Sequence, residues 1–566
     1  MAEAASGRCV LVVALLLSLV VTWPLVLHID SAIYGYPGDA LGTISDFWWF
    51  DYALHHGLPL LYNQLRGVPL GSGWENVYFD VVEVGLFAPL SYVLGPVIAY
   101  NLGVLSSFPL TAWVTFLLAR RLQMTRLAST FTGLTFAFVP YHQEKAMVHL
   151  LHTHMELYAA FLYFAIGWRQ TRRLRNIVLA AVVAGITLWT DPSMTYLMAF
   201  LVAIFFVTSL LVRGPDVVWR QQLVDHAKAA AITVAGAAVF IPAVVAVSAR
   251  GGAQRSGTFA GQYAASERTY QELVAFSARI KEYVLPWHLN PLLSNSLRAY
   301  EASGLHGSNF AEQTLTIGFT TLVLAAIGLI AFRRTYGALL AASVVVVAFI
   351  VSQPPDRSVF GIEVPFPSHF LYFVLPIFRA YARFGALVLL GAAVLAGFGF
   401  MALQGHLAVK QRWLLAAPFL LVALEFNGLP PSHDMQLLPA PAEYTWLKSQ
   451  PAGTLIEYPI AVKSTDPAVG TEIEVENRVY VFYQQVHEHP MFNGATATSQ
   501  AGQLAYTLEP YYASGVSDQL RALGIRYVFV HRAAYERFGR DPDQSLAGYR
   551  FIQRLAGTDI YVLGST

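Results

Sequence analysis

The chain contains a single cysteine, Cys9, and unusually few charged residues. One cysteine has no partner for an internal disulfide, and it excludes a metal or redox site built from cysteines. Only 13% of the 566 residues are charged, whereas 55% are hydrophobic, and the mean hydropathy is +0.49. Soluble proteins carry about 25% charged residues. The composition therefore excludes an ordinary cytosolic enzyme, a disordered chain and a nucleic-acid-binding protein.

Long apolar runs flanked by charge are the main feature that is present. A helix needs about 20 apolar residues to cross a bilayer. We predict about eleven transmembrane helices, and hence a mainly α, polytopic membrane protein. The predicted spans are Cys9–Leu27, Val97–Ala119, Leu127–Val139, Met155–Trp168, Asn176–Thr190, Pro192–Val212, Ala229–Val247, Leu315–Phe332, Gly337–Val351, Phe384–Leu403 and Trp413–Gly428. Val84–Gly95 is short and contains Pro89, so we interpret it as an interfacial or re-entrant segment.

The basic residues predict the orientation of these spans. Fifteen Arg and Lys residues lie at the N-terminus and in the loops after alternate spans, against four in the opposite short loops. Because basic loops stay in the cytoplasm, we expect a cytoplasmic N-terminus and an extracytoplasmic C-terminus in a multi-pass protein of the cell membrane. Cys9–Leu27 contains Pro24 and is not followed by an A-x-A site, which favours an anchor over a cleaved signal peptide.

The chain then divides into two domains. Residues 1–428 form the predicted transmembrane domain, with extracytoplasmic loops at 28–96 and 248–314. Residues 429–566 open with a proline-rich linker and contain strand-like runs at Thr454–Tyr458, Arg526–His531 and Ile560–Leu563. Glu443–Ser449 and Ser517–Leu523 have helical patterns. We predict a small extracytoplasmic α/β domain here.

Two aspartates in the first loop are candidate catalytic residues. Asp39 follows a Pro-Gly turn, and Asp46 lies on a predicted amphipathic helix, Leu41 to His56, which is rich in aromatic residues. An aspartate after Pro-Gly is often only a turn residue or a helix cap. A carboxylate can instead remove a proton from a hydroxyl group. Both interpretations remain open for Asp39.

More polar residues are predicted on the same outer face. His152 and His154 lie in the tip PYHQEKAMVHLLHTHME, Asp191 in the turn TDPS, and Glu312 before the eighth span. The histidines lack the spacing of a helical zinc motif, which favours hydrogen-bonding roles over metal binding. Asp191 is equally suited to capping the next helix, with Pro192 at its first position. We predict that all four side chains contribute to substrate binding.

Arg379 and Arg383 precede the tenth span in LPIFRAYARFG. Arginines four residues apart share a helix face, and a guanidinium group suits a phosphate anion. They could instead extend to lipid headgroups. Ionisable groups near a membrane are costly and therefore indicate function. A recess that combines a phosphate clamp, a base and lipid-facing walls is typical of transfer from a lipid-linked donor.

Several stretches together resemble the GT-C superfamily of multi-spanning glycosyltransferases, and more closely a bacterial branch of GT-C-like membrane proteins. They include YPGDALGTISDFWWF, FAFVPYHQEKAMVHLLHTHMELYAAFLYFAIGW and LPIFRAYARFGALVLLGAAVLAGFG. The resemblance implies a sugar donor on polyprenyl phosphate or diphosphate, and transfer with inversion to an extracytoplasmic glycan, lipid or protein. It implies an essential acidic residue in the first loop, best matched by Asp39 and next by Asp46. Arg379 and Arg383 would hold the leaving phosphate.

The chain also departs from this family. The first loop lacks a tight Asp-Glu pair, and His142 and Gln143 follow Pro-Tyr where an arginine is expected. Some GT-C enzymes need a divalent metal, for which Asp39, Asp46, His152 and Asp191 are candidate ligands. Two alternatives to an enzyme remain: a transporter or flippase of lipid-linked or polar substrates, and a non-catalytic GT-C-like envelope protein.

Overall fold

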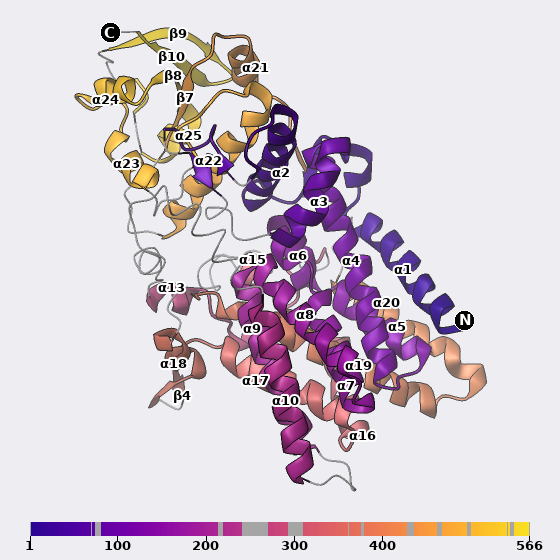
Figure 1. The fold of residues 1–566 in the computed structure, drawn as a ribbon. Helices are drawn as coiled ribbons and strands as arrows, with labels where there is room; N and C mark the ends of the chain where they lie inside the picture. Colours follow the sequence, from indigo (N-terminus) through magenta and orange to yellow (C-terminus); the bar gives the residue numbers. More distant parts are fainter. Residues whose placement is uncertain are drawn as a thin grey trace.

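The computed structural model describes residues 2–60, 62–69, 71–73, 81–212, 219–239, 270–291, 310–359, 362–374, 378–426, 435–460, 467–494, 500–539, 541–543 and 548–564. Most of the predicted loop 248–314 and the start of the proline-rich linker lie outside these residues. Figure 1 shows a bundle of helices with a smaller domain of strands and helices at one end.

Each of the eleven predicted apolar segments contains a helix. The helices are α1 (Ala2–Val21), α4 (Pro96–Arg121), α5 (Arg126–Ala137), α7 (Glu156–Thr171), α8 (Leu174–Thr190), α9 (Pro192–Leu211), α10 (Trp219–Ala238), α16 (Phe319–Phe332), α17 (Tyr336–Ser352), α19 (Gly385–His406) and α20 (Ala416–Phe426). α10 begins ten residues before the predicted segment, whose last residues, 240–247, lie outside the described part.

Only part of the predicted membrane topology is tested by these helices. Three described helical segments are long and apolar enough to cross a membrane: Pro96–Arg121, Ser193–Leu211 and Tyr381–His406. Five shorter apolar helices accompany them. The count of about eleven spans and the orientation of the termini therefore stay predictions. The interfacial candidate forms α3 (Val81–Leu94), with Pro89 inside it, and packs against α4.

Glycines allow a close helix contact in the bundle. α16 packs along α19, and a methyl group at Gly328 or Gly399 would clash with the backbone of the facing helix. Small residues let membrane helices approach closely. The largest buried apolar cluster runs through these helices and includes Leu324, Phe398 and Phe400.

Short elements connect the helices of the bundle. They are 3₁₀ turn η1 (Leu25–His28), β1 (Ala32–Tyr34), α2 (Asp39–His56), β2 (Tyr62–Asn63), β3 (Ser72–Gly73), α6 (Pro140–Val148), η3 (Leu150–His152), α13 (Tyr270–Ala275), η4 (Ile280–Tyr283), α15 (Phe310–Gln313), β4 (Asp356–Val359), β5 (Ile362–Pro365), α18 (Pro367–Val374) and η5 (Tyr381–Phe384). A further 3₁₀ segment, η6 (Val409–Leu415), lies between α19 and α20.

The C-terminal region folds around a four-stranded sheet in the order β7-β8-β10-β9. β7 (Thr454–Tyr458) and β8 (Ile525–His531) are parallel, whereas β10 (Thr558–Leu563) is antiparallel to β8 and to β9 (Tyr549–Leu555). The helices are α21 (Ala442–Lys448), α22 (Pro467–His487), α23 (Gln500–Leu508), α24 (Val516–Ala522) and α25 (Arg532–Arg537). The five predicted elements of this region are present to within two residues at each end, but β9, α22, α23 and α25 were not predicted.

The first loop lies between the bundle and this sheet domain. β1 pairs with β6 (Met435–Leu437), and α2 packs on α22. The Met491 N–H donates to the Leu65 carbonyl at 2.8 Å. In Figure 1, α2 lies where the two parts meet. This arrangement places the candidate catalytic loop at the boundary between the domains.

Candidate active site

Asp39 is the first residue of α2 and lies at the junction of three parts of the chain. Its Oδ2 atom lies 2.6 Å from His149 Nδ1, and its Oδ1 atom pairs with Arg478 of α22. The preceding loop crosses closely over the end of α6, since a Cβ at Gly35 would clash with the Met147 backbone. The Asp39 side chain remains 33% exposed, so a substrate group can reach it.

A second group of charged side chains is formed by Arg383, Glu312 and Lys145. Arg383, in η5, donates to both carboxylate oxygens of Glu312 from Nε (2.9 and 3.1 Å) and again from an NH2 nitrogen at 2.6 Å. The Lys145 ammonium lies 3.1 Å from the same carboxylate. Burial alone would raise the pKa of Glu312, but the charges of Arg383 and Lys145 hold it well below its usual value. Glu312 is therefore a carboxylate at neutral pH.

Asp191 extends this group through the start of α9. Arg383 donates to the Ser193 hydroxyl at 2.9 Å, and the Ser193 hydroxyl donates to Asp191. The Asp191 carboxylate also accepts the backbone N–H groups of Ser193 and Met194, which makes it the N-cap of α9. The capping interpretation of Asp191 is confirmed, and the same side chain belongs to the polar group around Arg383.

His149 links the two groups. Its ring contacts Asp39 directly, and the charges of Lys145, Glu312, Arg383 and Asp191 act on it. His152 is buried next to it, with ring centroids 5.6 Å apart in an edge-to-face arrangement. Asp39, Lys145 and Arg383 therefore all interact with this pair of histidines.

Two of the predicted substrate-binding residues have other contacts. Arg379 donates to Glu272 of α13 at 2.6 Å and lies over the Phe276 ring, so the two arginines do not share a carboxylate. Arg379 is also more exposed than Arg383. His154 Nδ1 lies 2.7 Å from Glu156.

Asp46 lies two turns after Asp39 on α2, in a different environment. Its carboxylate accepts a 2.9 Å hydrogen bond from Arg66, whose other terminal nitrogen donates to Ser45 at 2.5 Å. Burial raises the pKa of Asp46, and the Arg66 charge opposes that rise. Arg66 is itself buried and packs beside Gly494 of the sheet domain. The pair thus fastens α2 to the C-terminal region.

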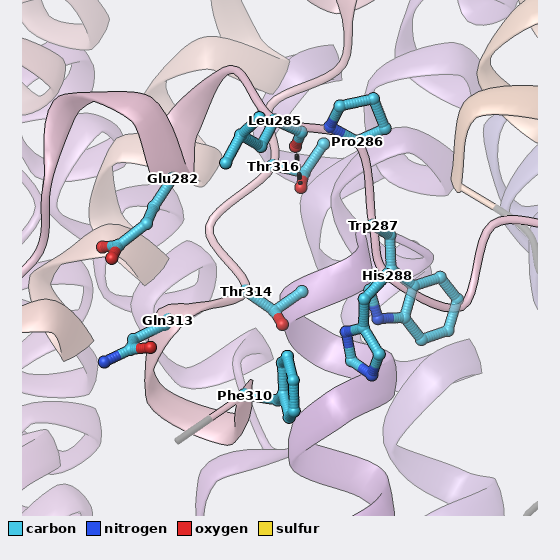
Figure 2. Close-up of a pocket in the computed structure, with 9 residues that line it drawn as sticks. All are labelled: Glu282, Leu285, Pro286, Trp287, His288, Phe310, Gln313, Thr314 and Thr316. Carbon is cyan, nitrogen blue, oxygen red and sulfur yellow. Dashed lines mark hydrogen bonds between the residues drawn. The ribbon is translucent and has the colours of Figure 1, made fainter. Parts of the chain in front are cut away.

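A narrow cavity lies behind the segment that carries Glu312. Figure 2 shows nine residues around it, from the stretches 282–288 and 310–316, with the Thr316 hydroxyl donating to the Leu285 carbonyl. Trp287 and His288, in its wall, both contact Glu144 of α6, the Trp287 indole by a 2.8 Å hydrogen bond. α6 therefore carries two buried charges, Glu144 toward this wall and Lys145 toward Glu312.

The four candidate metal ligands do not form a recognisable metal site. Among the residues that the structure describes, no three His, Cys, Asp or Glu side chains gather in a way that would hold a metal ion. Asp39 is paired with His149 and Arg478, Asp46 with Arg66, and Asp191 caps α9.

Several residues of the site were missed by the sequence reasoning. Lys145 and His149 lie in the polar tip, but nothing in their spacing separates them from the other ionisable residues there. Ser193 could have been found from the TDPS turn, which places a hydroxyl next to the cap. Arg478 gave no signal, because α22 was not predicted.

Comparisons with known proteins bear on the fold. No family model matches the chain, and no curated protein matches it. A cryo-EM structure of a mutant of arabinofuranosyltransferase AftD from Mycobacteria is similar with a TM-score of 0.55 and 15% identity. The match covers 99% of this chain and 42% of that one, so the chain spans less than half the length of that enzyme.

Structures of an oligosaccharyltransferase from Archaeoglobus fulgidus are also similar. The apo form gives a TM-score of 0.49 at 12% identity, covering 92% of this chain and 69% of that chain. AglB in complex with an inhibitory peptide and a dolichol-phosphate gives a TM-score of 0.49 at 12% identity, and the match covers 94% of this chain and 70% of that chain. The arabinofuranosyltransferase and the oligosaccharyltransferase are both GT-C glycosyltransferases. On the AftD likeness, this chain has a GT-C-like fold, as its sequence predicted.

Proposed function

We propose that the chain is an integral membrane glycosyltransferase. It moves a sugar from a polyprenyl-phosphate-linked donor to an extracytoplasmic acceptor, with inversion. The observation that carries the proposal is the contact of Asp39 with His149, which brings a part-exposed carboxylate to the group formed by Lys145, Glu312 and Arg383. The GT-C-like fold supports glycosyl transfer in general.

Asp39 is the proposed base. The acceptor hydroxyl oxygen attacks the anomeric carbon on the side opposite the phosphate, the bond from that carbon to the phosphate oxygen breaks, and Asp39 takes the hydroxyl proton. An aspartate is a weak base, so it acts as the proton becomes acidic in the transition state. His149 and Arg478 both hold the carboxylate, which fixes its orientation.

Arg383 and Lys145 are the proposed phosphate-binding groups. A guanidinium has five N–H donors, and the contacts of Arg383 with Glu312 and Ser193 use three of them. Two remain for an incoming phosphate, whose charge would grow as the bond breaks. Arg379, which is more exposed, would meet the donor headgroup first. The cations Arg383 and Lys145 would be held in place by Asp191, His152 and Glu312. His154 would hold the neighbouring segment, PYHQEKAMVHLLHTHME, in place.

The test is transfer from a radiolabelled polyprenyl-phosphate sugar by the purified protein. Asp39→Asn keeps the size of the side chain but removes its charge, and it should lower turnover by about 10²–10⁴-fold, the usual contribution of general base catalysis. Asp30→Asn is the matched control, because Asp30 lies in the same loop but is exposed. Wild-type turnover in Asp39→Asn would exclude this base. Absence of transfer from every donor by the folded wild type would favour a transporter or a non-catalytic protein.

A further inference from the structure

α18 and the β4–β5 hairpin carry an exposed apolar surface on the segment between α17 and α19. The surface consists of Ile362, Val364, Phe370, Phe373 and Val374, and we call it the α18 surface. Phe370, Phe373 and Val374 are 58%, 68% and 79% exposed. They are spaced i, i+3, i+4, so they share one face of the helix.

Polar contacts fix α18 to the bundle. The Ser368 hydroxyl donates to the Gln353 carbonyl at the end of α17. His369 Nδ1 lies 2.8 Å from the Tyr270 hydroxyl and 3.1 Å from Asp356. The helix is therefore held in an orientation that turns its large apolar side chains outward, away from the protein.

The position of α18 identifies what covers this surface. α18 packs against α17, and in Figure 1 it lies on the outside of the bundle, on the side away from α1. α17 and α16 themselves expose apolar side chains such as Val346 and Val323, as expected of helices that face lipid. The sequence of α18, PSHFLYFV, contains no Asp, Glu, Lys or Arg. Like these helices, α18 presents large apolar side chains away from the protein.

We propose that the α18 surface inserts into the outer leaflet of the membrane as an in-plane anchor. An amphipathic helix can lie in the plane of the interface, with its apolar face buried at the boundary of headgroups and acyl chains. The anchor would fix α18, which ends five residues before Arg379 in the sequence, at the depth of the lipid headgroups. This proposal does not depend on glycosyl transfer, because it concerns only where the helix lies.

The single native cysteine makes a direct test possible. In a Cys9→Ser background, Phe373→Cys is labelled with a nitroxide and the protein is placed in phosphatidylcholine–phosphatidylglycerol nanodiscs. Phe551→Cys is the matched control, since Phe551 is 52% exposed on β9 of the sheet domain. We expect the label at 373 to collide mainly with oxygen, and the label at 551 mainly with a water-soluble nickel chelate.

Two results would overturn the proposal. Equal access of the nickel chelate to both labels would show that α18 faces water. A label at 373 that neither reagent reaches would show that protein, such as a second copy of the chain, covers the surface. Phe370→Cys repeats the measurement on the same face, so that a local fault at one position is recognised.

Discussion

Lys145 is a fully buried cation whose charge depends on pH. Burial lowers its pKa to about 8, against the opposing attraction of Glu312. The ammonium is therefore mostly charged at pH 7 and neutral at pH 9, while Glu312 stays ionised because its pKa is lowered. The balance of charge around Arg383 consequently becomes more negative as the pH rises through 8.

Donor binding should follow this titration. We expect the KM for a polyprenyl-phosphate sugar to rise severalfold between pH 7 and pH 9, because an anion loses one of its two cationic partners. Lys145→Met should raise the KM at every pH and abolish the step near pH 8. Lys410→Met, an exposed lysine after α19, serves as the control. A donor KM that is flat across this range in the wild type would contradict the role of Lys145.

At the scale of elements, α2 is positioned by an ion pair as well as by its apolar residues. Phe47 and Ile44 of α2 are buried, and the pair of Asp46 with Arg66 ties the helix to the loop that crosses to the sheet domain. The sequence identified Asp46 as the second candidate catalytic residue. Its contacts instead resemble those of a structural side chain.

Asp46→Asn distinguishes these two roles. Removing one partner of a buried pair leaves the other charge uncompensated, which costs about 3 kcal/mol or more. We expect a lower apparent Tm in detergent, with the turnover of the molecules that remain folded close to that of the wild type. Asp30→Asn should leave the Tm unchanged. Lost turnover at an unchanged Tm would instead make Asp46 part of the catalytic machinery.

At the scale of the whole molecule, the C-terminal domain reaches the candidate base. Arg478 of α22 pairs with Asp39, and burial lowers the pKa of Arg478 to about 10, so it remains charged at neutral pH. The side chain is 30% exposed, and its helix α22 packs on α2. The sheet domain thereby contributes a charge to a candidate site whose other residues come from the helical bundle and its connecting segments.

Arg478 lies in the sheet domain, and Arg478→Met should nevertheless lower the rate of glycosyl transfer. Without the guanidinium, the Asp39 carboxylate keeps its contact with His149 but loses a second partner, and we expect kcat to fall about tenfold while the donor KM changes little. Arg526→Met, on β8 of the same domain, is the control, because Arg526 donates to the Ala452 carbonyl of its own domain. An unchanged kcat, or a change in the donor KM alone, would show that the domain does not position the base.

Local patterns in the sequence were enough to predict most of the bundle helices and to suggest where chemistry takes place. Runs of apolar residues predicted where the bundle helices lie, because the need to satisfy backbone groups within an apolar environment leaves helix as the available structure. The cost of ionisable residues near a membrane pointed to Asp39, Asp191, Glu312 and Arg383. These inferences depend on local spacing and composition, which can be read from the sequence without knowing the fold.

The pairing of the charges, in contrast, follows from the folded arrangement of the chain. Arg383 pairs with Glu312, 71 residues away, and Arg379 with Glu272, although the two arginines are four residues apart. Asp39 and Asp46, on one helix, pair with Arg478 and Arg66. A side chain's partner depends on how helices distant in the sequence pack. That packing follows from shape and burial over the whole chain, so no local pattern records it.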